Sequence, residues 1–245
     1  MPSETIVIVA IEDVLTDSGG NFSSWGFVWF HEVGWLRYDR NNRISEGDRM
    51  TFTQVRFASF ETYLAAEPWD LPDGHCEYWD GELIPVMSES LGNNAIANFI
   101  FVALMAIGLP FKLIRPGAVE VAVRGMPRTR FPDLIVLDDI HLTLLRRRST
   151  ITFDMPPPKM VLEVVSPGDE NSENYKRDYQ DKLFQYADRG IPEYWIVDPD
   201  RSWVMVGVLV AENYLFGTFR GDDAIVSPAF SKLRLTVTEI LEAGQ

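Results

Sequence analysis

A single glutamate, Glu163, lies inside an apolar run, the segment KMVLEVVSP at residues 159–167. The branched side chains around it predict a strand that is buried on both faces and ends at Pro167. Burying an unpaired carboxylate costs several kcal/mol or forces the group to take up a proton. We therefore expect Glu163 to have a partner, and the identity of that partner bears directly on function.

Asp133 is the first candidate partner, because the dipeptide Pro132-Asp133 begins a second apolar stretch, DLIVL. Proline suits the first residue of a strand. If the two strands are neighbours, their carboxylates meet, and close carboxylates repel unless they share a proton or bind a cation. Mg²⁺ takes such oxygens, and the Val164 carbonyl is an expected further ligand on the same rim. Without metal, Glu163→Gln is then expected to be neutral or stabilising.

Lys182 is the second candidate partner. Tyr175, Tyr179, Lys182 and Tyr186 are spaced 4, 3 and 4 residues apart and so share one face of a helix. Lys182 is therefore expected on the face that packs against the sheet, with Asp178 one turn before it. The alternative, equally consistent with the periodicity, is a lysine whose side chain runs along the helix edge into solvent.

The element order from residue 50 onward predicts an α/β (α+β) domain around one central mixed sheet flanked by helices. The expected elements are a helix capped by Ser59, a hairpin around Asp80-Gly81, an apolar helix that begins at Asn93 or Asn94 and ends near Gly108, strands at 118–123, 133–139 and 160–165, a helix from Ser172 to Gly190, strands at 193–200, 202–210 and 212–219, and a helix at 237–243.

Residues 1–49 differ from residues 50–245. The first segment has glycines, serines and aromatics without a clear period of 2 or 3.6 residues. We interpret it as a poorly patterned N-terminal extension, with Met50 as the functional start. The alternative is an added hairpin whose aromatics cover a sheet edge or a partner surface.

Charge is distributed unevenly along the chain, whose formal net charge is −14. The stretch 111–148 holds eight basic and four acidic residues, so it carries +4 and the remainder carries −18. Solvated loop arginines are the simplest interpretation. The functional alternative is contact with backbone phosphates, for which the candidates are Arg124, Arg128, Arg130 and residues 146–148.

The single cysteine, Cys76, excludes an intramolecular disulfide and fits a reducing, cytoplasmic compartment. The longest apolar stretch, at residues 95–110, is too short for a comfortable membrane span. The N-terminus has no basic start of the kind that signal peptides carry. We therefore expect a cytoplasmic protein without a membrane partner.

Four motifs in order, CEYWDGEL, FPDLIVL, VLEVVSP and DYQDKLFQYADRGIPEYWIVDP, resemble the Uma2 family. That family groups restriction-endonuclease-like proteins within the PD-(D/E)XK superfamily, and the resemblance covers roughly residues 52–240. It implies a restriction-endonuclease-like core. Val165 stands where the superfamily has its strand lysine, and the resemblance implies that Lys182 on the following helix replaces it. The positions that match the family pattern are Glu77, Asp133, Glu163, Asp178, Lys182 and Tyr186.

The resemblance implies metal-assisted phosphodiester hydrolysis. Asp133 and Glu163, with Glu77, would hold Mg²⁺ or Mn²⁺. Lys182 would orient or deprotonate a water or offset negative charge, and Asp178 and Tyr186 would support it. Nucleic acid, with DNA favoured, is the expected partner, and a homodimer is a candidate assembly.

Two other function classes compete with a nuclease. A catalytically silent binding or scaffold protein on the same fold is favoured by the net charge of −14 and by the missing strand lysine. A glycosidase with two carboxylates would need acids across an open sugar cleft, and no aromatic-lined run points to one. Convergence of Asp133, Glu163 and Lys182 in space separates a catalytic site from a silent fold.

Overall fold

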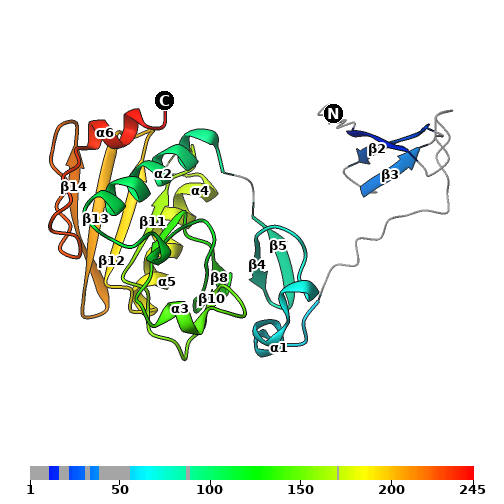
Figure 1. The fold of residues 1–245 in the computed structure, drawn as a ribbon, viewed down its shortest axis with the longest axis horizontal. Helices are drawn as coiled ribbons and strands as arrows, with labels where there is room; N and C mark the ends of the chain where they lie inside the picture. Colours follow the sequence, from blue (N-terminus) through cyan, green and yellow to red (C-terminus); the bar gives the residue numbers. More distant parts are fainter. Residues whose placement is uncertain (1–10, 17–21, 31–33, 39–55, 87–88, 170) are drawn as a thin grey trace. The chain divides into compact units, whose positions relative to one another are not determined.

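The structure is a computed structural model, and it describes residues 11–16, 22–30, 34–38, 56–86, 89–169 and 171–245 (Figure 1). The chain divides into two compact units, Met1–Gln54 and Val55–Gln245, and each is taken by itself below.

The smaller unit contains one antiparallel sheet in the order β1-β2-β3. Its strands are β1 (Ile11–Thr16), β2 (Phe22–Phe30) and β3 (Gly34–Tyr38). The sequence pattern predicted no regular element there. The reason lies in β2, where aromatic and small residues do not alternate, so the period-2 signal of a strand is lost.

A six-stranded sheet in the order β14-β13-β12-β11-β9-β6 is the centre of the larger unit. β11 and β12 are parallel, and every other neighbouring pair is antiparallel, so the sheet is mixed, as the sequence predicted. The strands are β6 (Ile114–Pro116), β9 (Leu134–Val136), β11 (Met160–Val164), β12 (Glu193–Asp198), β13 (Trp203–Val210) and β14 (Asn213–Arg220).

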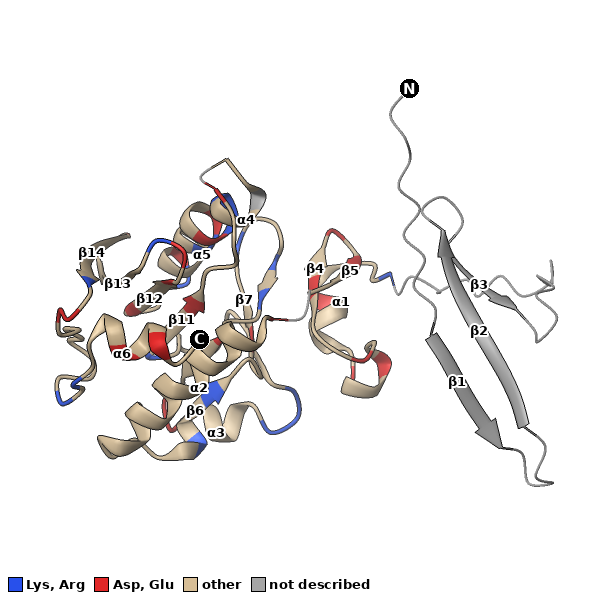
Figure 2. Cartoon of the chain, turned by 90° about the horizontal axis from the view of Figure 1, so that it is seen from above, with Lys and Arg blue, Asp and Glu red and all other residues tan. Residues whose placement is uncertain are grey.

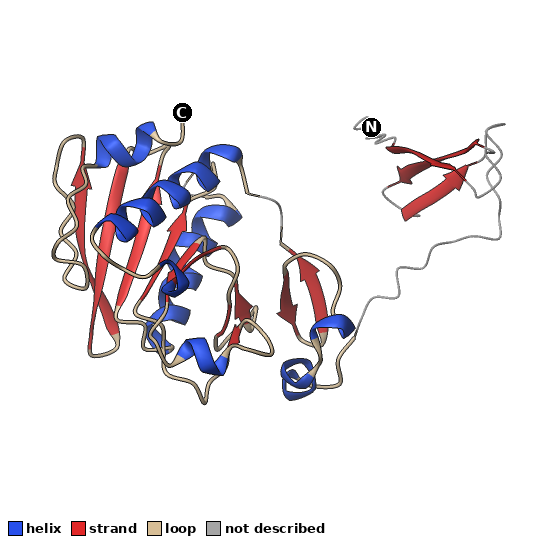
Figure 3. Cartoon of the chain, viewed as in Figure 1, coloured by secondary structure: helices blue, strands red, loops and turns tan. Residues whose placement is uncertain are grey.

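Helices flank both faces of this sheet (Figure 3). On one face, α2 (Leu91–Ala106) and α6 (Val237–Glu242) bury their apolar residues in a cluster that includes Leu162 and Val164 of β11. On the other face, α5 (Lys182–Asp188) packs against Val161 and Ile135. In the described ranges, no helix combines the length and the apolar character needed to cross a membrane.

The helix expected between Ser172 and Gly190 is present but contains an irregular turn. It runs through α4 (Glu173–Lys176), a π-helical turn (Arg177–Asp181) and α5. Ser172 caps its start by accepting a hydrogen bond from the Tyr175 amide at 3.1 Å. Gly190 ends it with φ of +76°, a conformation that glycine adopts without strain.

The predicted hairpin consists of β4 (Cys76–Trp79) and β5 (Glu82–Pro85). Its turn residues Asp80 and Gly81 both have positive φ, which matches the right-handed twist of paired strands. The hairpin packs against α1 (Phe60–Ala65), whose N-cap Ser59 accepts a hydrogen bond from the Thr62 amide.

A small sheet in the order β10-β7-β8 lies beside the hairpin, since the Tyr78 amide donates to Thr129 Oγ1 at 2.9 Å. Its strands are β7 (Glu120–Ala122), β8 (Thr129–Arg130) and β10 (Thr150–Ile151). β6, β8, β10 and α3 (His141–Leu144) were not predicted, because two to four residues are too few to show a period. Two 3₁₀ turns, Pro68–Asp70 and Phe111–Leu113, complete this unit.

Candidate active site

Glu163 is 1 % exposed and projects from the middle of the sheet. Along β11, Leu162 and Val164 face the α2 layer, while Val161 and Val165 face the α5 layer. Because side chains alternate along a strand, Glu163 belongs with the second set and points toward α5. The strand predicted from the apolar run is therefore correct, and its charged residue faces the helix that carries Lys182.

Asp133 immediately precedes β9, the antiparallel neighbour of β11. The register pairs Leu134 with Leu162, so its continuation by one residue sets Asp133 opposite Glu163. The Asp133 carboxylate also accepts a hydrogen bond from the Val164 amide, with a distance of 2.6 Å between Val164 N and Asp133 Oδ2. The structure thus brings these two sequence-predicted carboxylates to the same place on the sheet.

Two side chains of α5 bind the two oxygens of Glu163. Lys182 Nζ donates to Glu163 Oε2 at 2.8 Å, and the Tyr186 hydroxyl donates to Oε1 at 2.5 Å. Lys182 and Tyr186 are four residues apart and so share a face of α5. We call Asp133, Glu163, Lys182 and Tyr186 the Glu163 site. The alternative of a solvent-directed Lys182 is excluded, because its side chain is 12 % exposed.

Asp178 binds the other side of Lys182, with 2.8 Å between Asp178 Oδ1 and Lys182 Nζ. Arg177 donates to both oxygens of Asp178, at 2.9 and 3.0 Å. Arg177 and Asp178 both lie in the π-helical turn. Such turns are frequent at functional sites. Asp178 therefore pairs with the Lys182 ammonium from one turn earlier in the helix, as their spacing predicted.

Electrostatic strain is concentrated on the two sheet carboxylates. Burial, followed by the negative charge of Glu163, raises the pKa of Asp133 well above its usual range, and the nearby Lys182 offsets this only in part. Burial also raises the pKa of Glu163, and Lys182 again opposes the shift. A bound cation would relieve the repulsion from Glu163 that contributes to the shift of Asp133.

Lys182 is held in its charged form. Burial by itself lowers the pKa of a lysine, but the negative charges of Asp178 and Glu163 outweigh burial and raise the pKa of Lys182 above its ordinary value. Burial and the charge of Glu163 raise the pKa of the Tyr186 hydroxyl. Both groups are placed as hydrogen-bond donors to Glu163.

Asn93 of α2 contributes a contact that sequence reasoning missed. Its Nδ2 donates to the Val164 carbonyl at 3.4 Å and to Glu89 Oε2 at 3.1 Å. The expectation that Asn93 or Asn94 caps α2 is wrong, because the N-cap is Ser90, which accepts from the Asn93 amide. Asn93 is buried, and a buried amide on an otherwise apolar helix was the signal that could have identified it.

Glu77 of β4 is bound by Arg130, with 3.0 Å between Glu77 Oε1 and Arg130 Nη1. The same guanidinium donates to Gln185 Oε1 at 2.8 Å, so it joins the hairpin to α5. Arg130 is 2 % exposed and therefore does not fit the phosphate contact expected for it from the sequence. It is a structural arginine whose partners were too distant in sequence to be predicted.

Four other arginines of the basic stretch have an acidic or aromatic partner. Arg124 is exposed and lies 3.0 Å from Asp188, and the Arg128 guanidinium lies 4.0 Å above the Phe60 ring. Figure 2 shows the loop after α3 in blue, where Arg147 pairs with Glu67 and Arg148 pairs with Glu120. Arg124 is exposed and Arg128 is half-buried, whereas Arg130 is buried.

A comparison with protein families matches residues 60–238 to Uma2, which is described as "Putative restriction endonuclease". The chain belongs to the Uma2 family. All residues of the Glu163 site, together with Glu77 and Asp178, lie inside the matched range. A search of curated proteins finds no significant match.

Among solved structures, the Uma2 chain resembles the crystal structure of a "putative nuclease belonging to DUF820" from Anabaena variabilis ATCC 29413. The two are 16 % identical with a TM-score of 0.54, and the match covers 76 % of this chain and 98 % of the other. At this identity the comparison shows a shared fold. It agrees with the mixed sheet and flanking helices described above.

The Glu163 site of this Uma2 chain contains oxygen atoms that are candidate ligands for a metal ion. In the part of the chain that the structure describes, no group of three or more His, Cys, Asp or Glu side chains is arranged to hold a metal ion. Mg²⁺ does not require one, because it binds through one or two carboxylates and keeps waters and substrate phosphates. The paired carboxylates with raised pKa values, next to the Val164 carbonyl, fit that cation.

Proposed function

We propose that this protein is a metal-dependent nuclease that hydrolyses phosphodiester bonds of nucleic acid, with DNA as the expected substrate. The observation that carries the proposal is the meeting of Asp133, Glu163 and Lys182 on one face of the sheet. These groups come from three separate elements, in a chain of the Uma2 family. The packing of a sheet does not require two carboxylates and a lysine at one point, so their convergence supports a functional role.

Asp133, Glu163 and the Val164 carbonyl would hold Mg²⁺ or Mn²⁺. A cation held there would supply a coordinated water of lowered pKa and positive charge beside a phosphate. Lys182 donates hydrogen bonds to Glu163 and Asp178 and presents its positive charge beside the carboxylates. Its role in the proposal is to orient a phosphate oxygen or water and to offset developing negative charge. Its raised pKa argues against the base role that the sequence left open.

Tyr186 and Asp178 act through other residues. Tyr186 fixes one oxygen of Glu163, and Asp178 fixes the Lys182 ammonium. Asn93 fixes the Val164 carbonyl from the opposite layer of the fold. The reacting groups are therefore oriented by neighbours before substrate binds, which is the preorganisation that electrostatic catalysis needs.

The experiment is a panel of double-stranded and single-stranded DNA and RNA, incubated with Mg²⁺, Mn²⁺ or EDTA and separated on gels. We expect cleavage of DNA by the wild type with either metal, none in EDTA, and none by Asp133→Asn under any condition. Asp139→Asn changes an exposed aspartate in the same way and is the matched control. Equal cleavage by wild type and Asp133→Asn would mean that a contaminating nuclease is the source.

A nucleic-acid-binding protein without catalysis is the second candidate. It is favoured by one observation, namely that both oxygens of Glu163 already accept hydrogen bonds from Lys182 and Tyr186. Binding without turnover in the same panel, unchanged by Asp133→Asn, supports this candidate over the nuclease. A homodimer and a cytoplasmic location stay predictions, and light scattering of the purified protein tests the first.

A further inference from the structure

A cleft outside the Glu163 site lies between the β4–β5 hairpin and the small sheet. We call it the hairpin cleft, and its volume is about 170 Å³. Its apolar walls are formed by Leu71, Leu83 and Phe131, and its polar floor by Glu120, Arg148 and Thr150. None of these floor residues takes part in the proposed hydrolysis, so the cleft requires its own explanation.

The floor of the hairpin cleft combines a buried carboxylate with hydrogen-bond donors. Glu120 is 2 % exposed and accepts from Thr150 Oγ1 at 2.5 Å, from Arg148 Nη2 at 3.1 Å and from the Tyr63 hydroxyl. Arg148 Nη1 also donates to the Tyr63 carbonyl at 2.6 Å. A guanidinium has five N–H donors and a carboxylate about four acceptor positions. The floor can therefore both donate to a ligand and accept from it.

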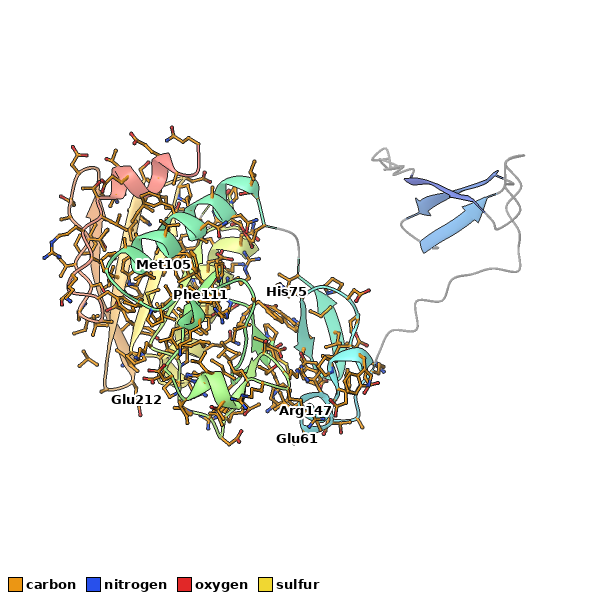
Figure 4. All side chains as sticks on the ribbon, in the orientation of Figure 1. Glu61, His75, Met105, Phe111, Arg147 and Glu212 are labelled. Carbon is orange, nitrogen blue, oxygen red and sulfur yellow. The ribbon has the colours of Figure 1, made fainter. Side chains whose placement is uncertain are left out.

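The walls of the cleft suit a flat ring. The rings of His75 and Phe131 are stacked, with 4.3 Å between centroids and 12° between planes. His75, labelled in Figure 4, is exposed and immediately precedes β4, so the cleft is open to solvent at this point. A volume of this size is close to the ~150 Å³ cavity that accommodates a benzene-sized ring.

The charge of the floor selects against a phosphate. Glu120 neutralises the adjacent Arg148 and would repel an anion. A ligand for this cleft should instead be uncharged, with flat apolar faces and an edge that carries both acceptors and N–H groups. Among the parts of a nucleic acid, the base has this character, while sugar and phosphate do not.

Position links the hairpin cleft to the Glu163 site. Phe131 lies two residues before Asp133, with the buried Pro132 between them. Along an extended chain, two residues span about 7 Å. A nucleotide whose phosphate lies near Asp133 can therefore place its base, or that of its neighbour, toward Phe131.

We propose that the hairpin cleft binds one unpaired base of a nucleic acid whose backbone lies at the Glu163 site. The base packs against the stacked pair of His75 and Phe131 and against Leu83, and it directs its edge toward Arg148 and Glu120. The proposal rests on the proposed function for the presence of nucleic acid. It adds that the substrate is single-stranded, or has a base extruded from its duplex, next to the phosphate that is held.

The test measures binding of fluorescent oligonucleotides by anisotropy in EDTA, so that no cleavage occurs. The probes are a single strand, the same strand in a duplex, and the same strand with abasic positions. We expect the wild type to bind the single strand about tenfold more tightly than the abasic strand, which is within the range for burying one base. Equal affinity for the normal and abasic strands would overturn the proposal.

Two variants locate the binding in the cleft. Ala118 lines the cleft and is exposed, so Ala118→Trp fills it, and Ala118→Ser is the matched control. We expect Ala118→Trp to bind the single strand as weakly as the wild type binds the abasic strand. Arg148→Gln should show the same loss, whereas Arg234→Gln removes an equal charge from an exposed position outside the basic stretch and should not. Thermal unfolding of each variant establishes that it is folded.

The outcomes separate this proposal from the nuclease. Base-dependent binding that Ala118→Trp abolishes, in a protein that cleaves nothing, supports the cleft and contradicts the proposed hydrolysis. Metal-dependent cleavage with no difference between Ala118→Trp and Ala118→Ser, in either binding or cleavage, supports the proposed hydrolysis and contradicts base binding in the cleft. Binding of a free nucleoside without any affinity for oligonucleotides also overturns the proposal.

Discussion

The ammonium group of Lys182 lies 2.8 Å from a carboxylate oxygen of Glu163, so a helix supplies the cation for a carboxylate buried in the sheet. The strand position two residues after Glu163, where a lysine could have met the same carboxylate, is occupied by the buried Val165. The helical lysine gains a second carboxylate, Asp178, which a strand lysine at that position would not share. Lys182 therefore lies between two buried negative charges.

This pairing reverses the stability effect that the sequence predicted for Glu163→Gln. Glu163→Gln relieves repulsion with Asp133, but it also removes the negative charge beside Lys182. The amide has one acceptor oxygen, so either Lys182 or Tyr186 faces an NH₂ group that cannot accept its hydrogen bond. We expect a loss of about 1.5–3 kcal/mol in metal-free buffer, since hydrogen bonds to charged groups have that magnitude. Urea unfolding at pH 7 measures it, and an unchanged midpoint would show that Asp178 alone suffices for Lys182.

Asp133→Asn should behave in the opposite way. Asp133 has a raised pKa and accepts a hydrogen bond from the Val164 amide, which an asparagine oxygen also accepts. We expect unfolding free energy to stay the same or to rise by about 0.5–2 kcal/mol, as is common when strain at a functional site is removed. Cleavage and metal-dependent stabilisation should both disappear. A large loss of stability would instead mark Asp133 as a structural residue.

Asp178 should make stability depend on pH in the acid range. Burial raises its pKa, but Lys182 and Arg177 outweigh burial, so the pKa of Asp178 is lowered in the folded state. A lowered pKa stabilises the fold above the ordinary aspartate value of about 3.9 and loses this contribution as the pH falls through the folded value.

Melting temperatures of wild type and Asp178→Asn from pH 7 to pH 2 test this expectation. The wild type should be more stable at pH 7, and the difference should shrink below about pH 4. Asp181→Asn changes an exposed aspartate of the same π-helical turn and should show no such trend. A difference between wild type and Asp178→Asn that is constant across the range contradicts the expectation.

Residues 50–245 are expected to fold without the preceding segment. The unit Val55–Gln245 contains all three clusters of buried apolar side chains described in the structure. The truncated protein should therefore melt within a few degrees of the full chain in differential scanning calorimetry. Loss of soluble expression, or a drop of many degrees, would show that aromatic residues of the segment belong to the core.

Local rules predicted much of this fold because the signals were local. The Ser59 cap, the Asp80-Gly81 turn and the Gly190 stop each depend on the conformation of one or two residues, and all three are present. Helix periodicity put Lys182 on the face shared with the tyrosines but left a solvent-directed side chain open, and the structure decides between the two. The opposition of Asp133 and Glu163 required only that two apolar strands be neighbours.

The features that were missed depend on residues far apart in sequence. Arg130 was expected at the surface, but Glu77 and Gln185, each more than 50 residues away, bury it. Asn93 was expected as a cap, but its amide reaches a carbonyl 71 residues later. Whether an arginine or an asparagine is exposed depends on such partners, and no periodicity in a single sequence reports them.

The dispersal of the Glu163 site over β9, β11 and α5 has a consequence for synthesis of the protein. A nascent chain displays Asp133 first, then Glu163, and only later the helix with Lys182 and Tyr186. β12, which closes the other edge of β11, comes later still. Because ribosomes add about 5–20 residues per second, a growing chain passes seconds without a complete site. On the proposed function, a half-made copy lacks the complete set of reacting groups until the sheet closes.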